Sequence, residues 1–369
     1  MSAAETLKIL TANMEQGLGV FPSTFSAKGF PVGACNTAGF RNVQEDSAFA
    51  GEPKTHIPDV KAAHQFLRGQ AKYIQEITAR CRGISTLAMA LFLPDGNLVT
   101  AHVGDTQIYS YGLPKSTAFP SVSSIMLPNG QRVIESISTI PTYALQTPNY
   151  SVTFLSAEAG LPPFHPLLEP HRIGNLAEIE ALRSRGLTIN YKGRVPVIEV
   201  RTPAVHCNIQ ITGCVGNGQV SEELGHDFGY HVFSPTDLSA MNSQLILMAT
   251  DGFEPATYNH LIPTQIMDHI GEEDGMAMIA AYCAREAIRR GSKDNVTVMA
   301  TNPAKPPKAP VWMVMMDCSS SSDVAIVTND HLKRMVTRPY ILEATRPKTS
   351  TIGPGHPAHP MRHPRTRRR

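Results

Sequence analysis

Short strand-like segments joined by turn signals occupy the middle of this sequence and set the strongest limit on its fold. Three apolar runs follow one another closely, at residues 85–94, 97–104 and 106–112. They are separated by Asp95-Gly96 and by Gly104-Asp105, which are typical turn pairs. The three runs therefore predict an antiparallel meander.

Helical patterns lie in separate blocks. Residues 58–81 repeat apolar side chains near a 3.6-residue period, and Pro58 suits a first helical turn. Residues 175–186 begin with Asn at a cap position and end in Gly. Residues 275–291 form an amphipathic helical pattern between two more strand-like runs, 244–250 and 294–302. Strands in hairpins with helices in separate blocks predict an α+β fold in which helices cover antiparallel sheets.

Composition indicates a globular protein with one main domain. The chain has 369 residues, of which 42% are hydrophobic, and its 29 Pro and 27 Gly indicate many turns. No apolar run approaches the ~18 residues that a membrane span needs, and the first residues lack the pattern of a signal peptide. We therefore expect a cytoplasmic protein. Its six scattered cysteines, with no CxxC pair, are expected to be reduced.

Charge is unevenly distributed along the chain. The net charge is +2, yet residues 331–369 hold ten Lys or Arg and a single acid, Glu343, so the rest of the chain is acidic overall. The end of the chain is rich in Pro, His and Arg and is expected to be disordered. This tail is either a plain solvated end, a targeting signal that would allow nuclear localisation, or a contact for a polyanion such as nucleic acid or an anionic membrane.

These composition shifts suggest a division of the chain into five parts. Residues 311–317 and 323–330 read as two strands joined by a serine-rich turn, after a run with four prolines. The expected parts are a lead-in (1–29), a main domain (30–301), a Pro-rich linker (302–310), a C-terminal extension with two strands (311–348) and a basic disordered tail (349–369).

Acidic residues stand at the ends of several predicted strands. Asp251 follows the run 244–250, Asp294 precedes the last strand of the main domain, and Arg41 lies four and five residues before Glu45 and Asp46. Carboxylates converging on one edge would suit Mg²⁺ or Mn²⁺, and an arginine beside them could hold a phosphate with two hydrogen bonds. Taken singly, Asp residues at strand ends and turns usually cap loops.

Five segments in order resemble the metal-dependent Ser/Thr protein phosphatase family, the PPM or type 2C class. The segments are GFRNVQED (39–46), GISTLAMALFLPDGNLVTAHVGDTQIY (83–109), ITGCVGN (211–217), LILMATDGF (245–253) and GSKDNVTV (291–298). Glu169, Arg172 and Ile173 are similar to a further motif of that family. The resemblance implies a four-layer αββα sandwich of two antiparallel sheets flanked by helices, with a metal site at one end.

The resemblance also implies a mechanism and a set of site residues. Two Mg²⁺ or Mn²⁺ ions would activate a water that attacks the phosphorus of phosphoserine or phosphothreonine in a protein substrate. Arg41 would hold the phosphate, and Glu45 would assist directly or through water. Asp46, Asp251 and Asp294 would ligate metal, with Asp105 and Gly252 as further candidates. Asp105 can equally be a turn residue.

One motif of the family is missing at its expected place. Between Asp46 and Gly83 the family has a strand ending in Asp-Gly-x-Gly-Gly, whose Asp bridges both metals, but no Asp-Gly occurs there in this chain. Glu52 or Asp59 could take over that role. Two functions therefore stay open: a phosphatase with a remodelled or weakened metal site, and a pseudophosphatase that binds a phosphopeptide or partner. The retained acids favour the first, and the missing motif favours the second.

Overall fold

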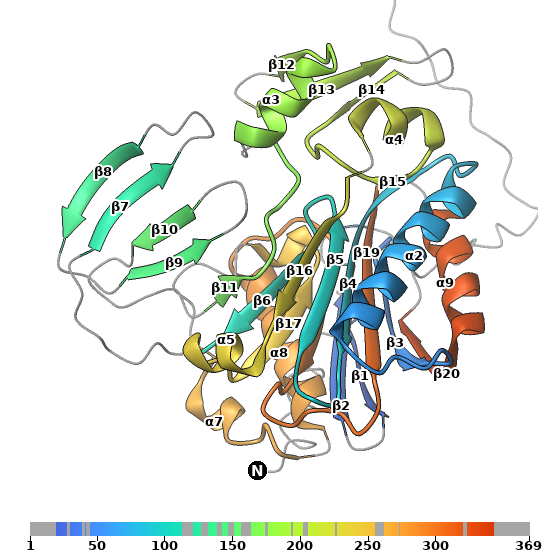
Figure 1. Cartoon of the computed structure of the whole chain (residues 1–369), viewed down its shortest axis with the longest axis vertical. Helices are drawn as coiled ribbons and strands as arrows, with labels where there is room; N and C mark the ends of the chain where they lie inside the picture. Colours follow the sequence, from blue (N-terminus) through green and yellow to red (C-terminus); the bar gives the residue numbers. More distant parts are fainter. Residues whose placement is uncertain are drawn as a thin grey trace, which may run out of the picture.

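The computed structural model is an α+β structure with two main antiparallel sheets and helices on their outer faces (Figure 1). It describes residues 20–27, 30–38, 41, 45–112, 121–126, 132–138, 142–146, 151–155, 164–173, 176–192, 195–201, 206–225, 227–254, 262–272, 274–319 and 323–342. The predicted basic tail, 349–369, lies outside these residues, as do residues 1–19.

The first main sheet has the strand order β1-β2-β18-β17-β6-β11, and all its neighbouring strands are antiparallel. Its strands are β1 (Val20–Ala27), β2 (Phe30–Thr37), β6 (Gln107–Tyr111), β11 (Phe164–Pro166), β17 (Leu245–Ala249) and β18 (Val296–Thr301). Helix α8 (Gly275–Arg289) packs on this sheet against β2 and β18. Because β1 and β2 form a hairpin, the sheet begins before residue 30, within the stretch expected to be a lead-in.

The second main sheet has the strand order β16-β5-β4-β19-β3-β20, and β15 also pairs with β4. Its strands are β3 (Ser47–Pro53), β4 (Ile84–Phe92), β5 (Leu98–Val103), β15 (Val215–Gly216), β16 (Gly229–Phe233), β19 (Val311–Ser319) and β20 (Val336–Leu342). Helices α2 (Val60–Thr78) and α9 (Asp323–Met335) contact its strands and each other.

Strand β19 is a continuous apolar run because both of its faces are buried. Trp312, Val314 and Met316 belong to the hydrophobic cluster that includes residues of α2 and α9. Met313 and Met315 belong to the cluster that also holds residues of β2, β17 and β18 from the other sheet. A strand covered on both sides loses the alternation of polar and apolar residues. Residues 311–319 are therefore part of the core of the fold, and residues 302–310 join one main sheet to the other.

Smaller elements complete the structure. A four-stranded sheet, ordered β8-β7-β10-β9, and a three-stranded sheet, ordered β12-β13-β14, lie beside the main sheets in Figure 1. Their strands are β7 (Ser121–Met126), β8 (Arg132–Ser138), β9 (Thr142–Gln146), β10 (Ser151–Leu155), β12 (Ile189–Lys192), β13 (Val195–Arg201) and β14 (His206–Ile209). The remaining helices are α3 (Leu176–Ser184), α4 (Gly218–Leu224), α5 (Pro235–Ala240), the 3₁₀ turn η1 (Asp251–Phe253) and α7 (Thr264–Met267).

Two sequence predictions of local structure are wrong. The run 323–330, expected to be a strand, is the first part of α9, where Val324, Ala325, Thr328 and Leu332 are buried at helical spacing. A short apolar run does not distinguish the two periods. The predicted meander is also incomplete: β4 and β5 pair, but β6 joins the other sheet. The chain changes sheets at Gly104, whose φ of +90° suits glycine.

No helix in the described part of the chain is both long and apolar enough to span a membrane. All six cysteines are free thiols. Burial raises the pKa of the Cys214 thiol to about 12, so this thiol stays protonated and unreactive near neutral pH. The sequence prediction of reduced, structural cysteines is confirmed for the thiol state.

Candidate active site

Aspartates from both main sheets gather at one end of the molecule. Strand β17 runs antiparallel to β18, with Ala249 opposite Val298, so Asp251 after β17 and Asp294 before β18 lie at the same end. Strand β6 begins there as well, because Gln107 pairs with Ala249, and this places Asp105 nearby. The charge of Asp251 contributes to a raised pKa of both Asp105 and Asp294, as expected for a carboxylate that lies beside each of them.

Asp46 is the most buried acid of this group, with an exposed fraction of 1%. The hydroxyls of Thr250 and Thr297 donate to the same carboxylate oxygen, Oδ2, at 2.9 and 3.0 Å. Burial, with a smaller contribution from the nearby Asp251 and Asp294, raises the pKa of Asp46 to about 7 against the opposing effect of the two hydroxyls. A charged carboxylate at this buried position destabilises the folded state unless a cation lies beside it or a proton neutralises it.

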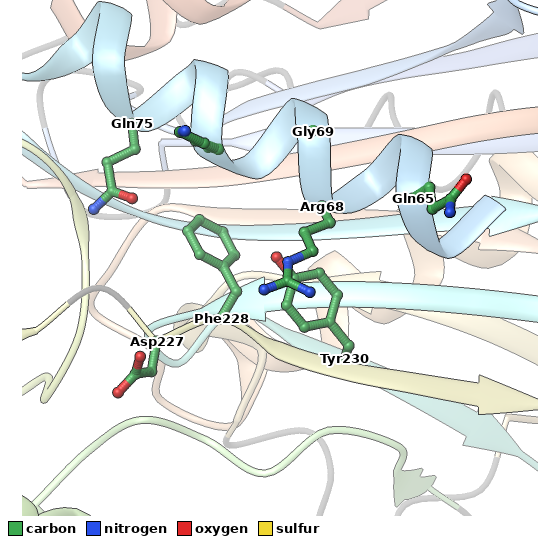
Figure 2. Close-up of a pocket in the computed structure, with 8 residues that line it drawn as sticks. Gln65, Arg68, Gly69, Gln75, Asp227, Phe228 and Tyr230 are labelled. Carbon is green, nitrogen blue, oxygen red and sulfur yellow. The ribbon is translucent and has the colours of Figure 1, made fainter. Parts of the chain in front are cut away.

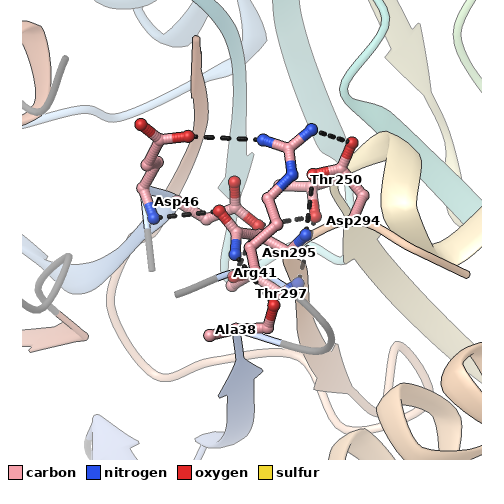
Figure 3. A network of polar contacts seen from close by, with 8 residues as sticks. Ala38, Arg41, Asp46, Thr250, Asp294, Asn295 and Thr297 are labelled. Atoms are coloured by element: carbon pink, nitrogen blue, oxygen red, sulfur yellow. Dashed lines mark hydrogen bonds and ion pairs between the residues drawn. The ribbon is translucent and has the colours of Figure 1, made fainter. Parts of the chain in front are cut away.

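Arg41 is ion-paired across the site. Its Nη2 lies 2.5 Å from Oδ2 of Asp294, and its Nη1 lies 3.3 Å from Oε2 of Glu45. Asn295 ties the two chain segments together: its Oδ1 accepts from the Glu45 backbone N–H at 3.0 Å, and its Nδ2 donates to the Ala38 carbonyl at 3.2 Å. Figure 3 shows the guanidinium with a carboxylate on either side. The Arg41 side chain remains 43% exposed, so it is accessible to a ligand.

Asp105 forms the other flank of the group. Burial and, to a smaller extent, Asp251 raise the pKa of Asp105 to about 7, although the guanidinium of Arg172 opposes the rise. Arg172 also pairs with Glu254, from its Nη2 to Oε1 at 2.7 Å. The site thus has an arginine on each flank, and sequence reasoning assigned a role to Arg41 alone.

Asp317 is a member of the group that sequence reasoning missed. Burial raises its pKa well above the ordinary value, and Asp46, Asp251 and Asp105 raise it further. A hydrogen bond between the Asp317 and Asp251 side chains acts in the same direction. The signal was present in the sequence: the run VWMVMMD (311–317) ends in Asp and is followed by small residues. The strand-ending acid Asp251 follows a run of the same kind.

Neither Glu52 nor Asp59 belongs to this group, so the expectation that one of them replaces the missing bridging acid is wrong. The side chain of Asp59 accepts a hydrogen bond from the Ala62 backbone N–H at 2.8 Å and caps helix α2. Glu52 lies six residues beyond Asp46 along β3, which corresponds to about 20 Å at ~3.3 Å per residue.

Gly252 is placed by close packing. A Cβ at this position would clash with the backbone oxygen of Asn295, so only glycine lets η1 approach the start of β18 this closely. Asn217, which stands where the resembled family has an acid, caps helix α4 through a 3.4 Å hydrogen bond from the Val220 backbone N–H. It accordingly has a local structural role.

The donor chemistry of the group fits a hard divalent cation. It consists of carboxylates without sulfur or imidazole, as Mg²⁺ and Mn²⁺ prefer. Among the described residues, no three His, Cys, Asp or Glu side chains are already arranged as a metal-ligand set. Protons, threonine hydroxyls and Arg41 compensate the carboxylates instead. Metal binding would therefore require rotation of these side chains and the release of protons.

A separate cavity of about 510 Å³ lies between α2 and β16 (Figure 2). Arg68, Lys72, Asp227, Phe228 and Tyr230 are among its lining residues. It contains none of the grouped aspartates and is distinct from the candidate active site.

Comparison with known proteins finds similar solved structures but no similar sequences. No protein-family model matches the chain, and no curated protein matches it. A C. elegans sex determining protein is similar over 78% of this chain, at 12% identity and a TM-score of 0.39, and the chain spans 65% of its length. The Staphylococcus aureus Ser/Thr phosphatase Stp1 is similar over 77% of this chain and 88% of its own, at 11% identity and a TM-score of 0.36.

The PPM Ser/Thr phosphatase MsPP from Mycobacterium smegmatis is similar over 78% of this chain and 98% of its own, at 13% identity and a TM-score of 0.31. The structures that match this chain thus include members of the phosphatase family that the sequence motifs resemble. At such identities and TM-scores the function has to be argued from the site itself.

Proposed function

We propose that this protein is a Mg²⁺- or Mn²⁺-dependent phosphoserine/phosphothreonine protein phosphatase with the four-layer αββα sandwich of the PPM class. The observation that carries the proposal is the ion pair between Arg41 and Asp294, which lie 253 positions apart in sequence. It brings a phosphate-binding group to an edge where Asp46 and Asp251 also lie. Motif residues from three distant segments thereby share one accessible site.

In this function Asp46, Asp251 and Asp294 would hold the cations. A bound divalent cation would lower the pKa of a water molecule and neutralise charge on the phosphoryl group. Thr250 and Thr297 fix the orientation of the Asp46 carboxylate through their hydroxyl hydrogen bonds. These two threonines are positioning residues, since they act through Asp46.

Arg41 has the second chemical role. Its two terminal nitrogens, Nη1 and Nη2, are paired with the carboxylates of Glu45 and Asp294. If Asp294 served as a metal ligand, the arm of the Arg41 guanidinium that now pairs with it would be free to bind phosphoryl oxygens. Glu45 keeps the other arm in place, which makes it an orienting group for the phosphate-binding arginine.

A pseudophosphatase is the second candidate function. It is favoured by the lack of a ready-made metal-ligand set among the described residues. Such a protein would use Arg41 to recognise a phosphopeptide and would hydrolyse little. The two functions differ in turnover, because both require Arg41 but only the enzyme requires the cations.

The test is hydrolysis of p-nitrophenyl phosphate and of a phosphothreonine peptide, with Mn²⁺ and after chelation. We expect turnover that chelation abolishes, and an Asp251→Asn variant that is at least ~100-fold slower, since even residues supporting metal ligands cost 10–100-fold. Asp95→Asn is the matched control, because Asp95 lies in the β4–β5 turn, where it accepts hydrogen bonds from Asn97. Metal-independent binding of the phosphopeptide without turnover would favour the pseudophosphatase.

A further inference from the structure

A strand from the C-terminal part of the chain fills the place between β3 and β4. Strand β19 pairs with β4 over its whole length, from Val311 opposite Phe92 to Ser319 opposite Ile84. Along its other edge it pairs with β3, from Trp312 opposite Gly51 to Met316 opposite Ser47. The two flanking strands are joined in sequence by helix α2 alone, so the sheet is incomplete until residues 311–319 are in place.

Both ends of the segment 311–335 lie at a single peptide bond of the N-terminal part. At its start, Trp312 is opposite Gly51, so Val311 lies beside the end of β3 at Pro53. At its end, the Lys54 backbone N–H donates to the Met335 carbonyl at 2.9 Å, and the Lys54 ammonium donates to the Arg334 carbonyl at 2.8 Å. The strand β19 and helix α9 thus begin and end next to the bond between residues 53 and 54.

The segment is held in this place by specific contacts as well as by burial. The hydroxyl of Ser85 donates to the Asp317 carbonyl at 2.8 Å. The carboxylate of Asp323 accepts from the backbone N–H groups of Arg82 and Gly83 at 2.7 and 3.3 Å. These bonds fix the strand end and the following helix start against the segment that opens β4.

The register directs Asp317 toward the acidic group. Met316 is opposite Ser47 in the antiparallel register of β19 and β3. Continuing this register by one position places Asp317 opposite Asp46. Side chains alternate along a strand, and Met313 and Met315 lie in the cluster between the two sheets, so Asp317 faces the same way. There it lies near Asp251 and Asp46 and retains some accessible surface, unlike the 1% exposed Asp46.

We propose that Asp317 is the bridging metal ligand of this site. We further propose that residues 311–319 supply the strand that is missing after Asp46, and that this strand and the helix α9 that follows it occupy a later place in the chain order. The inference rests on the proposed metal-dependent function and deepens it. Two short connections would place residues 311–335 between β3 and α2 in the chain order. One would join Pro53 to Val311, and the other would join Met335 to Lys54. The acid missing between Asp46 and Gly83 is then displaced in sequence and retained in space.

The first test measures metal binding without any activity. Wild type, Asp317→Asn and Glu52→Gln are titrated calorimetrically with Mn²⁺, and their melting temperatures are recorded with Mn²⁺ and with chelator. We expect Asp317→Asn to bind Mn²⁺ at least tenfold more weakly, to lose the metal-induced rise in melting temperature, and to melt no lower than wild type in chelator. Glu52→Gln should bind Mn²⁺ like wild type. Equal Mn²⁺ affinities in wild type and Asp317→Asn would overturn the ligand assignment.

The second test reorders the full chain. Residues 311–335 are inserted between Pro53 and Lys54 with a short Gly/Ser turn, and Pro310 is joined to Val336 by a linker of about four residues. Val336 pairs with Pro53 on the side of β3 that faces away from β19. The linker therefore has to cross β3, from the start of β19 to the start of β20, a distance of two strand spacings or about 10 Å. We expect the reordered chain to fold with the circular dichroism spectrum and Mn²⁺ affinity of wild type. A control with the same segment inserted between Asp95 and Gly96 should not fold.

The outcomes separate this inference from the proposed function. A reordered chain that folds, with no Mn²⁺ binding in it or in wild type, would refute the metal-dependent function and the role of Asp317 while supporting the changed order. If the reordered chain fails to fold as completely as the control does, the inference of a changed chain order is wrong. The titration of Asp317→Asn would still decide its role as a ligand.

Discussion

The buried Asp46 carboxylate makes the stability of the metal-free protein depend on pH in a direction that can be stated in advance. Burial raises the pKa of Asp46 from 3.8 to about 7. The folded state therefore holds this proton more tightly than the unfolded state does. Its contribution to stability is complete below pH ~4 and is lost as the pH rises to about 7. The metal-free protein should become less stable over this interval.

The magnitude follows from the same pKa. A shift from 3.8 to about 7 corresponds to roughly 4 kcal/mol at 1.36 kcal/mol per pH unit. Asp46→Asn removes this penalty and keeps the local hydrogen bonds, because Thr250 and Thr297 both donate to one oxygen that the amide oxygen of asparagine can replace. In chelator at pH 8, we expect the variant to be about 2–4 kcal/mol more stable than wild type. At pH 4 we expect the two proteins to be nearly equal.

The assay is urea unfolding followed by tryptophan fluorescence at several pH values from 4 to 8, in chelator and in Mg²⁺. The single tryptophan, Trp312, is fully buried and reports directly on the core beside α2. Mg²⁺ should stabilise wild type at pH 8 and have little effect on Asp46→Asn. Parallel pH profiles for wild type and variant in chelator would refute the argument that the Asp46 carboxylate is strained by burial.

Three further predictions follow from other parts of the structure. Arg41→Ala should raise KM for a phosphopeptide with little change in melting temperature, and Arg41→Lys should restore little because an ammonium cannot form two parallel hydrogen bonds; equal KM values for all three proteins would contradict this role. Trp312→Ala should cost about 3–5 kcal/mol in urea unfolding, since the indole is fully buried and contacts the rings of Phe49 and Phe66 edge-on; a loss under ~1 kcal/mol would show that the segment 311–319 is not part of the core. Deleting residues 349–369 should lower retention on heparin at low salt and leave the melting temperature and turnover unchanged; a destabilised truncation would show that the tail packs on the domain.

Strong local patterns made much of the fold predictable. The ends of helices α2 and α8 and of strands β17 and β18 lie within three residues of the positions expected from apolar periodicity and turn residues. The positions of acids at strand ends predicted that Asp251 and Asp294 would be neighbours, and the structure places them together. The catalytic and ligand roles of these residues remain proposals that the experiments above address.

The remaining features depend on pairings that no local pattern contains. The sequence predicts β19 as a strand of a C-terminal extension. Its pairing with β4, about 230 positions earlier in the chain, places it inside the sheet. Asp317 was missed for the same reason, since its neighbours Asp46 and Asp251 are distant in sequence. The change of sheet at Gly104 was also missed, because the turn signal Gly-Asp does not state which sheet the next strand joins.

The late position of β19 in the sequence has a consequence for synthesis on the ribosome. Strands β3 and β4 are complete by residue 92, but the strand between them ends at Ser319. At roughly 5–20 residues per second, translation leaves their inner edges without a partner for on the order of 10–50 s. Open strand edges pair readily with other chains, so these two edges are exposed to incorrect pairing during this interval. The same delay keeps the acidic group incomplete, and any hydrolase activity absent, until almost the whole sheet has been synthesised.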